Sequence, residues 1–130
     1  MRLLLDTHVF VWAADSIDHV RLSDSARAAI EDRRNDTFVS AASAWEIATK
    51  YRLGRLPSGG RIVDEWTAAL AGLGAADLTV TSQHGLMAGG FPASHGDPFD
   101  RMLAAQAIVE DARLVTTDPV MAAFGAQVLW

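Results

Sequence analysis

Short runs of consecutive apolar or β-branched residues recur along the chain, and they lack the strict alternation of a half-exposed strand. Such runs are typical of parallel strands that are covered on both faces. They predict strands at residues 3–5, 37–39, 78–80, 114–116 and 127–129. Helical spacing and helix-start residues predict helices at residues 9–15, 23–33, 43–53, 62–73, 82–88, 97–111 and 119–124, with glycine- and proline-marked loops at 54–60 and 89–96. This alternation predicts an α/β fold, namely a three-layer α/β/α domain with a mostly parallel sheet of about five strands.

Composition narrows the class of protein. The chain has 130 residues, of which 50% are hydrophobic, and this suffices for one domain with its own core. It has no cysteine, which excludes disulfides, thiolate metal sites and thiol nucleophiles. The formal net charge of −5 argues against broad, charge-driven coating of nucleic acid, but it allows an enzyme that gathers acids around a metal. The apolar runs are too short for a secretion signal or a membrane span, so we expect a cytoplasmic protein without membrane association.

Acidic residues follow the predicted strands or open the helices after them. Asp6 and Asp118 follow strands, Glu46 lies in a first helical turn, and Asp97 and Asp100 open the helix at 97–111. Because parallel strands end at one edge of a sheet, these acids are expected at that edge, where ligands gather. Clustered carboxylates repel one another unless a cation is present, and hard divalent ions prefer carboxylate oxygens. The pattern therefore favours a site for Mg²⁺ or Mn²⁺.

Each acid also has a purely structural interpretation. Ser43 and Glu46 have the spacing of a capping box. Asp97 and Asp118 each precede a proline, as a helix N-cap does, and Asp6 is placed to cap the helix that follows it. A helix start needs only one cap, and serine, threonine or asparagine serve as well. Acids at four helix starts beside one sheet edge therefore favour the metal site over four separate caps.

Other chemical motifs are absent or ambiguous. The sequence has no glycine-rich phosphate loop, no His-x-x-x-His pair and no Gly-x-Ser-x-Gly elbow. His8 and His95 lie near the acids, but a surface role is favoured for both over contact with substrate or with the metal site. Lys50, Arg52 and Arg55 fit a solvated helix end and a contact to an RNA backbone equally well.

Four segments form one ordered set of motifs. They are Leu-Leu-Leu-Asp-Thr-His-Val-Phe-Val-Trp at 3–12, Ser-Ala-Trp-Glu-Ile at 43–47, Asp-Pro-Phe-Asp-Arg at 97–101 and Leu-Val-Thr-Thr-Asp at 114–118. Together they resemble the PIN-domain ribonucleases, above all the VapC-type toxins of toxin–antitoxin pairs. The resemblance extends over essentially the whole chain and implies a single PIN domain at residues 1–130, with a Mg²⁺- or Mn²⁺-dependent RNA endonuclease site.

The resemblance assigns the four catalytic acids of the family to Asp6, Glu46, Asp100 and Asp118. We expect Asp6 and Asp100 to bind the ion directly and Asp118 to complete the metal site or act through a water. Glu46 would bind a second ion or orient the attacking water. A bound Mg²⁺ polarises a phosphate oxygen and activates a water for in-line attack, so no protein nucleophile is needed. The resemblance implies products with 5′-phosphate and 3′-hydroxyl ends.

Auxiliary roles fall on residues beside these acids. Asp100 is preferred to Asp97 as the third acid because it directly precedes the family-like helix at 102–107, which leaves Asp97 as an auxiliary acid or only a cap. Thr116 or Thr117 matches a position where a hydroxyl supports the metal site, and Thr7 is a further auxiliary candidate.

The resemblance also implies partners. It implies RNA as substrate, a homodimer, and a cognate antitoxin, which is a small DNA-binding protein whose C-terminal segment covers the acidic cleft. That segment needs an apolar groove. The helices that carry Trp12, Trp45 and Trp66 are candidates for supplying it.

Two other functions remain as alternatives. A receiver-type signalling domain is also an α/β/α module that binds Mg²⁺, but it needs paired acids after the first strand and a lysine after the last. Here Asp6 stands alone and Lys50, the only lysine, lies mid-chain. A catalytically idle PIN-like binding module would be expected to have lost acids. Titrating Mn²⁺ while following the cleavage of a labelled RNA pool separates the three possibilities.

Overall fold

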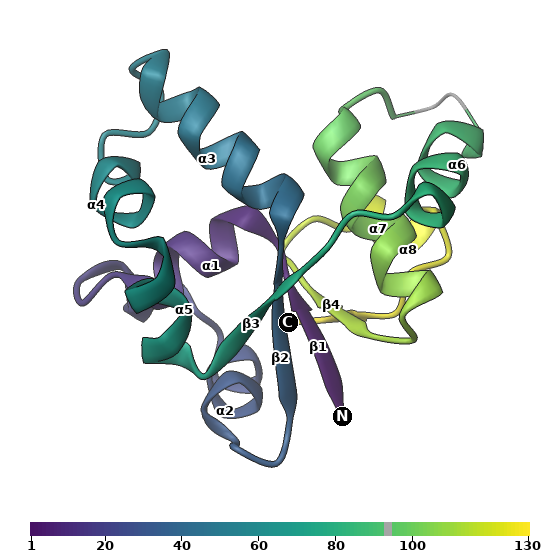
Figure 1. The fold of residues 1–130 in the computed structure, drawn as a ribbon. Coiled ribbons are helices and arrows are strands. Elements are labelled where there is room, and N and C mark those ends of the chain that lie inside the picture. The colour runs from purple at the N-terminus through teal and green to yellow at the C-terminus, as the bar shows by residue number, and fades with distance from the viewer. Residues whose placement is uncertain (93–94) are drawn as a thin grey trace.

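Five parallel strands form the central sheet of the computed structural model, which describes residues 1–92 and 95–130 (Figure 1). Within these residues the strand order is β3-β2-β1-β4-β5, and every adjacent pair is parallel. The strands are β1 (Arg2–Leu5), β2 (Asp36–Ser40), β3 (Ala75–Leu78), β4 (Arg113–Val115) and β5 (Val128–Leu129). The predicted α/β/α fold with a parallel sheet of about five strands is confirmed.

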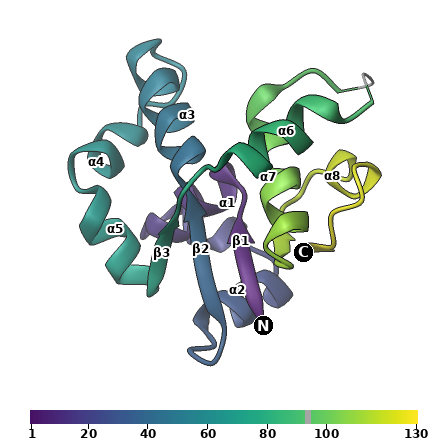
Figure 2. The same ribbon diagram turned by 45° about the vertical axis from the view of Figure 1, so that its right-hand side comes forward.

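Helices connect the strands and cover both faces of the sheet. They are α1 (Thr7–Ala14), the 3₁₀ helix η1 (Asp18–Arg21), α2 (Asp24–Glu31), α3 (Ala41–Arg52), α4 (Gly59–Asp64), α5 (Trp66–Leu73), α6 (Ser82–Gly90), α7 (Pro98–Val109) and α8 (Val120–Ala123). Figures 1 and 2 show α4 and α5 on one side of the strands and α6, α7 and α8 on the other. Helix α3 extends beyond the end of β2, between these two groups. No helix of the described residues is long and apolar enough to cross a membrane.

The central strand β1 contributes leucines to two hydrophobic cores, one on each face of the sheet. Leu3, Leu4 and Leu5 are each 0% exposed. Leu3 and Leu5 pack into the core under α1, α2, α4 and α5, and Leu4 packs into the core under α7 and α8. Full burial of a leucine side chain stabilises a fold by about 1.5–3 kcal/mol. Strand β1 is therefore a rigid support for the residue that follows it, Asp6.

The single helix predicted at residues 62–73 is wrong, because the segment forms two helices. The chain breaks between α4 and α5 at Glu65, whose backbone is not helical (φ −120°, ψ 37°). Gly59 and Gly60, predicted to lie in a loop, begin α4 instead. A Cβ on Gly60 would lie 2.6 Å from the ring of Tyr51 on α3, and one on Gly59 would lie 3.2 Å from Ile47. These glycines therefore serve the close packing of α4 on α3.

The third strand lies three residues earlier than the predicted one at 78–80. Gly74 adopts a left-handed conformation (φ +63°) that ends α5 and turns the chain directly into β3. Strand β3 lies at the edge of the sheet, and its sequence Ala-Ala-Asp-Leu has little apolar pattern to reveal it. The loop predicted at 89–96 begins later, because Gly89 and Gly90 belong to α6, and its residues 93 and 94 lie outside the described residues.

Candidate metal and active site

Asp6 and Asp118 are joined through one threonine. Asp6 follows β1 and is 7% exposed, and Thr116 follows the neighbouring strand β4. The Thr116 hydroxyl donates to Asp6 Oδ2 at 2.6 Å and accepts from the Asp118 backbone N–H at 3.0 Å. Thr117 is exposed. Of the two hydroxyls predicted here, Thr116 is the one that contacts the acids.

The interpretation of these two acids as helix caps holds only in part, since Asp6 does occupy the N-cap position of α1. The Asp6 side chain makes no capping hydrogen bond to α1. The N-cap position of α8 is Pro119, although Asp118 Oδ1 accepts from the backbone N–H of Val120 at 2.9 Å. Both carboxylates therefore retain free acceptor capacity at the sheet edge.

Asp97 and Asp100 differ in their surroundings. Asp97 is the N-cap of α7 and is exposed, and its Oδ1 accepts from the backbone N–H groups of Phe99 (2.8 Å) and Asp100 (3.2 Å). Asp100 is half-buried, and its Oδ2 lies 2.8 Å from His95 Nε2. Ligand atoms of His95, Asp100 and Asp118 all lie within 4.8 Å of one another. These three side chains form a group that can hold a metal ion.

Glu46 is anchored on its own side of the site. The capping box predicted for Ser43 and Glu46 is wrong, because α3 begins two residues earlier, where the Ser40 side chain accepts from the backbone N–H of Ala42. Glu46 is 4% exposed and accepts from the Thr7 hydroxyl at 2.6 Å, and that hydroxyl lies 2.8 Å from Ser43 Oγ. Thr7 therefore links α1 to α3.

The predicted RNA contacts Lys50, Arg52 and Arg55 do not share one environment. Lys50 lies one turn after Glu46, and its Nζ pairs with Glu46 Oε2 at 2.5 Å. Arg52 ends α3 and Arg55 follows it, and both are exposed. Lys50 therefore belongs to the acidic site, while the two arginines lie on the solvent-facing end of this region.

The electrostatics of the site fit a divalent cation. Burial raises the pKa of Asp6 and of Asp100, and nearby negative charge raises them further. The pKa of Asp100 responds to the charges of Asp97, Asp6 and Glu46, so acids from separate elements share one field. Carboxylate oxygens are the ligands that Mg²⁺ and Mn²⁺ take. The donor set therefore fits a hard divalent ion, whose charge would offset the cost of burying these acids.

His95 lies closer to the acids than the favoured interpretation predicted. A surface role was favoured for it, but its ring is half-buried and contacts Asp100. His8 is exposed on α1, as expected. The available signal was position, because His95 stands two residues before Asp97 and therefore close to the start of α7.

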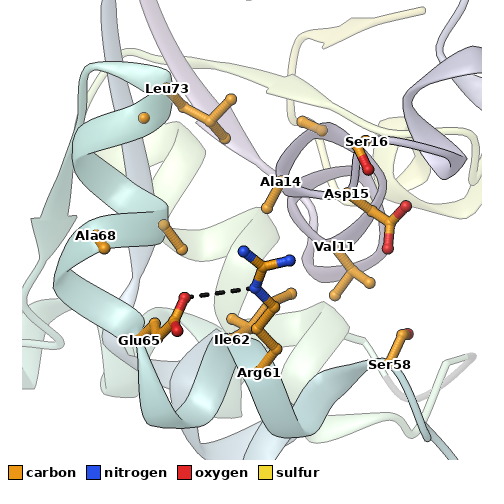
Figure 3. Close-up of a pocket in the computed structure, with 13 residues that line it drawn as sticks. Val11, Ala14, Asp15, Ser16, Ser58, Arg61, Ile62, Glu65, Ala68 and Leu73 are labelled. Carbon is orange, nitrogen blue, oxygen red and sulfur yellow. Dashed lines mark hydrogen bonds and ion pairs between the residues drawn. The ribbon is translucent and has the colours of Figure 1, made fainter.

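The three tryptophans proposed to flank an apolar groove lie in different places. Trp45 is 65% exposed and packs edge-to-face on Phe99 of α7. Trp12 packs on Trp130, and Trp66 packs against Phe10. A groove does lie between α1 and the pair α4–α5 (Figure 3), so two of the three helices border it, but none of the three indoles lines it.

Comparison with known proteins identifies relatives. The family described as PIN domain matches residues 3–126. Ribonuclease VapC16 of Mycobacterium tuberculosis is 56% identical over 43 residues, which are 30% of this chain and 30% of that protein. Solved structures that are less than 25% identical to this chain show the fold alone. They include VapBC2 from Rickettsia felis, solved bound to a DNA fragment from its promoter (18% identity, TM-score 0.72, 99% of this chain and 98% of that chain), and FitAcB from Neisseria gonorrhoeae (17%, 0.64, 98% and 96%).

Proposed function

Because the chain belongs to the PIN-domain family, whose match covers residues 3–126, we propose that it is a metal-dependent RNA endonuclease and the toxin of a toxin–antitoxin pair. The observation that supports the proposal is that His95, Asp100 and Asp118 lie together in one group, while Thr116 links Asp6 to the backbone of Asp118. The short, 56%-identical match to a VapC ribonuclease supports the same function.

In this proposal Asp6 and Asp100 hold Mg²⁺ or Mn²⁺, and Asp118 completes the site directly or through a water. The ion would supply Lewis-acid stabilisation of the phosphate and a water of lowered pKa. Thr116 holds the Asp6 carboxylate in place by donating to its Oδ2.

Glu46 has a separate proposed role. Its two oxygens are held by Thr7 and Lys50, so the carboxylate is fixed at the edge of the site. We assign it to orienting the attacking water or to a second ion. Lys50 then places a cation beside the acids, where a backbone phosphate of the RNA would lie, and Arg52 and Arg55 extend that contact.

The proposed partners follow from the proposed function as the toxin of a toxin–antitoxin pair. RNA is the substrate, a second copy forms the homodimer, and the cytoplasm is the proposed location. The antitoxin is a small DNA-binding protein whose C-terminal segment enters the groove beside α1 and reaches the acids. The groove wall carries Val11, Ala14 and Ile62, which suit an apolar segment.

Of the alternatives, the receiver-type domain is wrong. Receivers have the strand order 2-1-3-4-5, whereas this sheet has the order β3-β2-β1-β4-β5. A catalytically idle module of the PIN family is the alternative that experiment must separate from the nuclease.

The test is cleavage of a labelled RNA pool by the purified chain while Mn²⁺ or Mg²⁺ is titrated in. We expect cleavage that depends on the ion, stops with a chelator and leaves 5′-phosphate ends. The Asp6→Asn variant keeps the size of the side chain and an oxygen that can accept from Thr116, so it should fold and fail to cleave. Cleavage without added metal, or by Asp6→Asn at the wild-type rate, would contradict the proposal.

A further inference from the structure

A nitrogen donor stands among the acids. His95 Nε2 lies 2.8 Å from Asp100 Oδ2. One ligand atom each from His95, Asp100 and Asp118 lie within 4.8 Å of one another. The ring also packs against Phe124, with 5.9 Å between the ring centroids. Contacts on both sides therefore aim the imidazole at the carboxylates.

Arg101 fastens the backbone that carries this histidine. Its guanidinium donates to five backbone carbonyl oxygens, which belong to Ala88, Gly89, Phe91, Pro92 and His95. The bond to His95 itself is 2.9 Å long. Only arginine offers five donors in a rigid fork. Arg101 directly follows Asp100 on α7. The same helical turn therefore carries both the acid and the arginine that holds the backbone of His95.

We infer that His95 is a nitrogen ligand of the metal ion proposed for this site, and that Arg101 is the residue that positions it. The inference rests on the proposed function for the presence of the ion, and goes beyond it in the donor set. A purely carboxylate site suits Mg²⁺ and Mn²⁺ alike, whereas imidazole binds transition metals in preference to Mg²⁺. His95 therefore biases the site towards Mn²⁺.

The chemistry of the contact supports a ligand over a surface role. The half-buried His95 ring is held between Asp100 and Phe124, so it has one defined position rather than the freedom of a solvated surface side chain. As a ligand it adds a neutral donor to a crowded group of negative charges, so it completes the coordination without more repulsion. The five contacts of Arg101 would then pre-organise the ligand.

The test uses Mn²⁺ alone as the probe, with binding measured by calorimetry and electron spin-echo modulation from ¹⁴N measured on the bound ion. The wild type should show ¹⁴N modulation, and His95→Ala should lose it and bind Mn²⁺ at least about tenfold more weakly. Mg²⁺ binding should change by less than about threefold. His19→Ala, which removes an exposed histidine on η1, is the matched control and should behave as wild type.

Other outcomes overturn the inference. Modulation that survives in His95→Ala, or that disappears in His8→Ala instead, would remove His95 as a ligand. Equal loss of Mn²⁺ and Mg²⁺ affinity would mean that His95 only supports Asp100. The positioning role of Arg101 predicts that Arg101→Lys keeps the charge but loses the ¹⁴N modulation while still folding. Retained modulation would remove that role.

Failure of this inference is distinguishable from failure of the proposed function. If wild type cleaves RNA with metal and Asp100→Asn does not, while His95→Ala binds Mn²⁺ normally, only the donor assignment fails. If wild type binds neither ion and leaves RNA intact, the nuclease proposal itself fails.

Discussion

At the scale of single residues, one hydroxyl organises the acids. The Thr116 hydroxyl donates to the buried Asp6 carboxylate and accepts from the Asp118 backbone N–H, so it satisfies one polar group of each acid. Thr116→Val keeps the shape and removes both hydrogen bonds. We expect the free energy of unfolding to fall by about 1–3 kcal/mol, because a buried carboxylate loses its donor.

Urea unfolding and metal-dependent cleavage check this prediction together. Thr116→Ser restores the hydroxyl and should recover most of both. Wild-type stability in Thr116→Val would show that the hydroxyl does not support Asp6.

Asp97 and Asp100 should prove unequal. Asp97→Ser replaces one N-cap residue with another, so stability should change by less than about 1 kcal/mol and activity only modestly. Asp100→Ser removes a half-buried charge that caps nothing, so stability should be kept or rise while cleavage falls at least about 10²-fold. Melting temperatures and Mn²⁺-dependent rates decide the ranking. The reverse order would move the third ligand to Asp97.

The buried acids predict a pH dependence of stability without metal. Burial raises the pKa of Asp6 and Asp100 above the ordinary 3.8. Between 3.8 and the raised pKa the folded state binds more protons than the unfolded one, so the free energy of unfolding falls as pH rises through that window. Above the raised pKa the destabilisation is fully present.

Urea unfolding in a chelator, from about pH 4 to pH 8, measures this effect. The difference between wild type and Asp100→Asn isolates the contribution of Asp100 from that of other acids, such as Asp32, whose pKa Arg34 lowers to about 2. The variant should be the more stable one at pH 8, and its advantage should shrink as pH falls. A constant difference across this range would contradict the sign.

At the scale of elements, α3 carries an ion pair into the site. Glu46→Gln keeps an oxygen for the Thr7 hydroxyl and removes the charge that pairs with half-exposed Lys50. Because Glu46 does not form a capping box, a loss of activity cannot come from a lost cap. We expect α3 to remain folded, as circular dichroism would show, and cleavage to fall at least about tenfold. Cleavage by Glu46→Gln at the wild-type rate would mean that Glu46 has only a structural role.

Elements with strong local patterns were predictable from sequence. The apolar runs of β1, β2 and β4 marked the centre of the sheet, and Asp97-Pro98 marked the start of α7. The third strand was misplaced because an edge strand needs few apolar residues, so its position depends on pairing with β2. The break at Glu65 and the role of Gly60 depend on packing between helices, which no local pattern records.

The residues of the candidate site were also predictable only in part. The acids could be found because each follows a strand or opens a helix. Position placed His95 near the acids, but its contact with Asp100 was not predicted, because that contact depends on the hydrogen bonds by which Arg101 holds five backbone carbonyls. The pair of Glu46 and Lys50 was readable from the sequence, because their i,i+4 spacing on one helix favours an ion pair, but Lys50 was weighed only as a solvated helix end or an RNA contact.

At the scale of the whole molecule, the groove and the acids lie at different places in the fold. The groove lies between α1 and the pair α4–α5, whereas Asp100 on α7 and Asp118 after β4 lie on the other side of β1. The groove is lined by the C-terminal half of α1, whereas Asp6 precedes its first residue, so a partner segment that covers both would extend along α1. Binding of the partner and catalysis are therefore separable by mutation.

Gly72 allows this separation to be tested. It lines the groove on α5, and a Cβ built on it meets no atom within 4 Å, so Gly72→Arg fills the groove without a clash in the fold. Gly85→Arg on α6 is the matched control, since its Cβ also meets open space and it does not line the groove. Co-expressed with the product of the neighbouring upstream gene, wild type and Gly85→Arg should form a stable complex with suppressed cleavage. Gly72→Arg should bind that partner at least about tenfold more weakly while the purified chain keeps its metal-dependent cleavage. Equal binding by both arginine variants would place the partner elsewhere on the molecule.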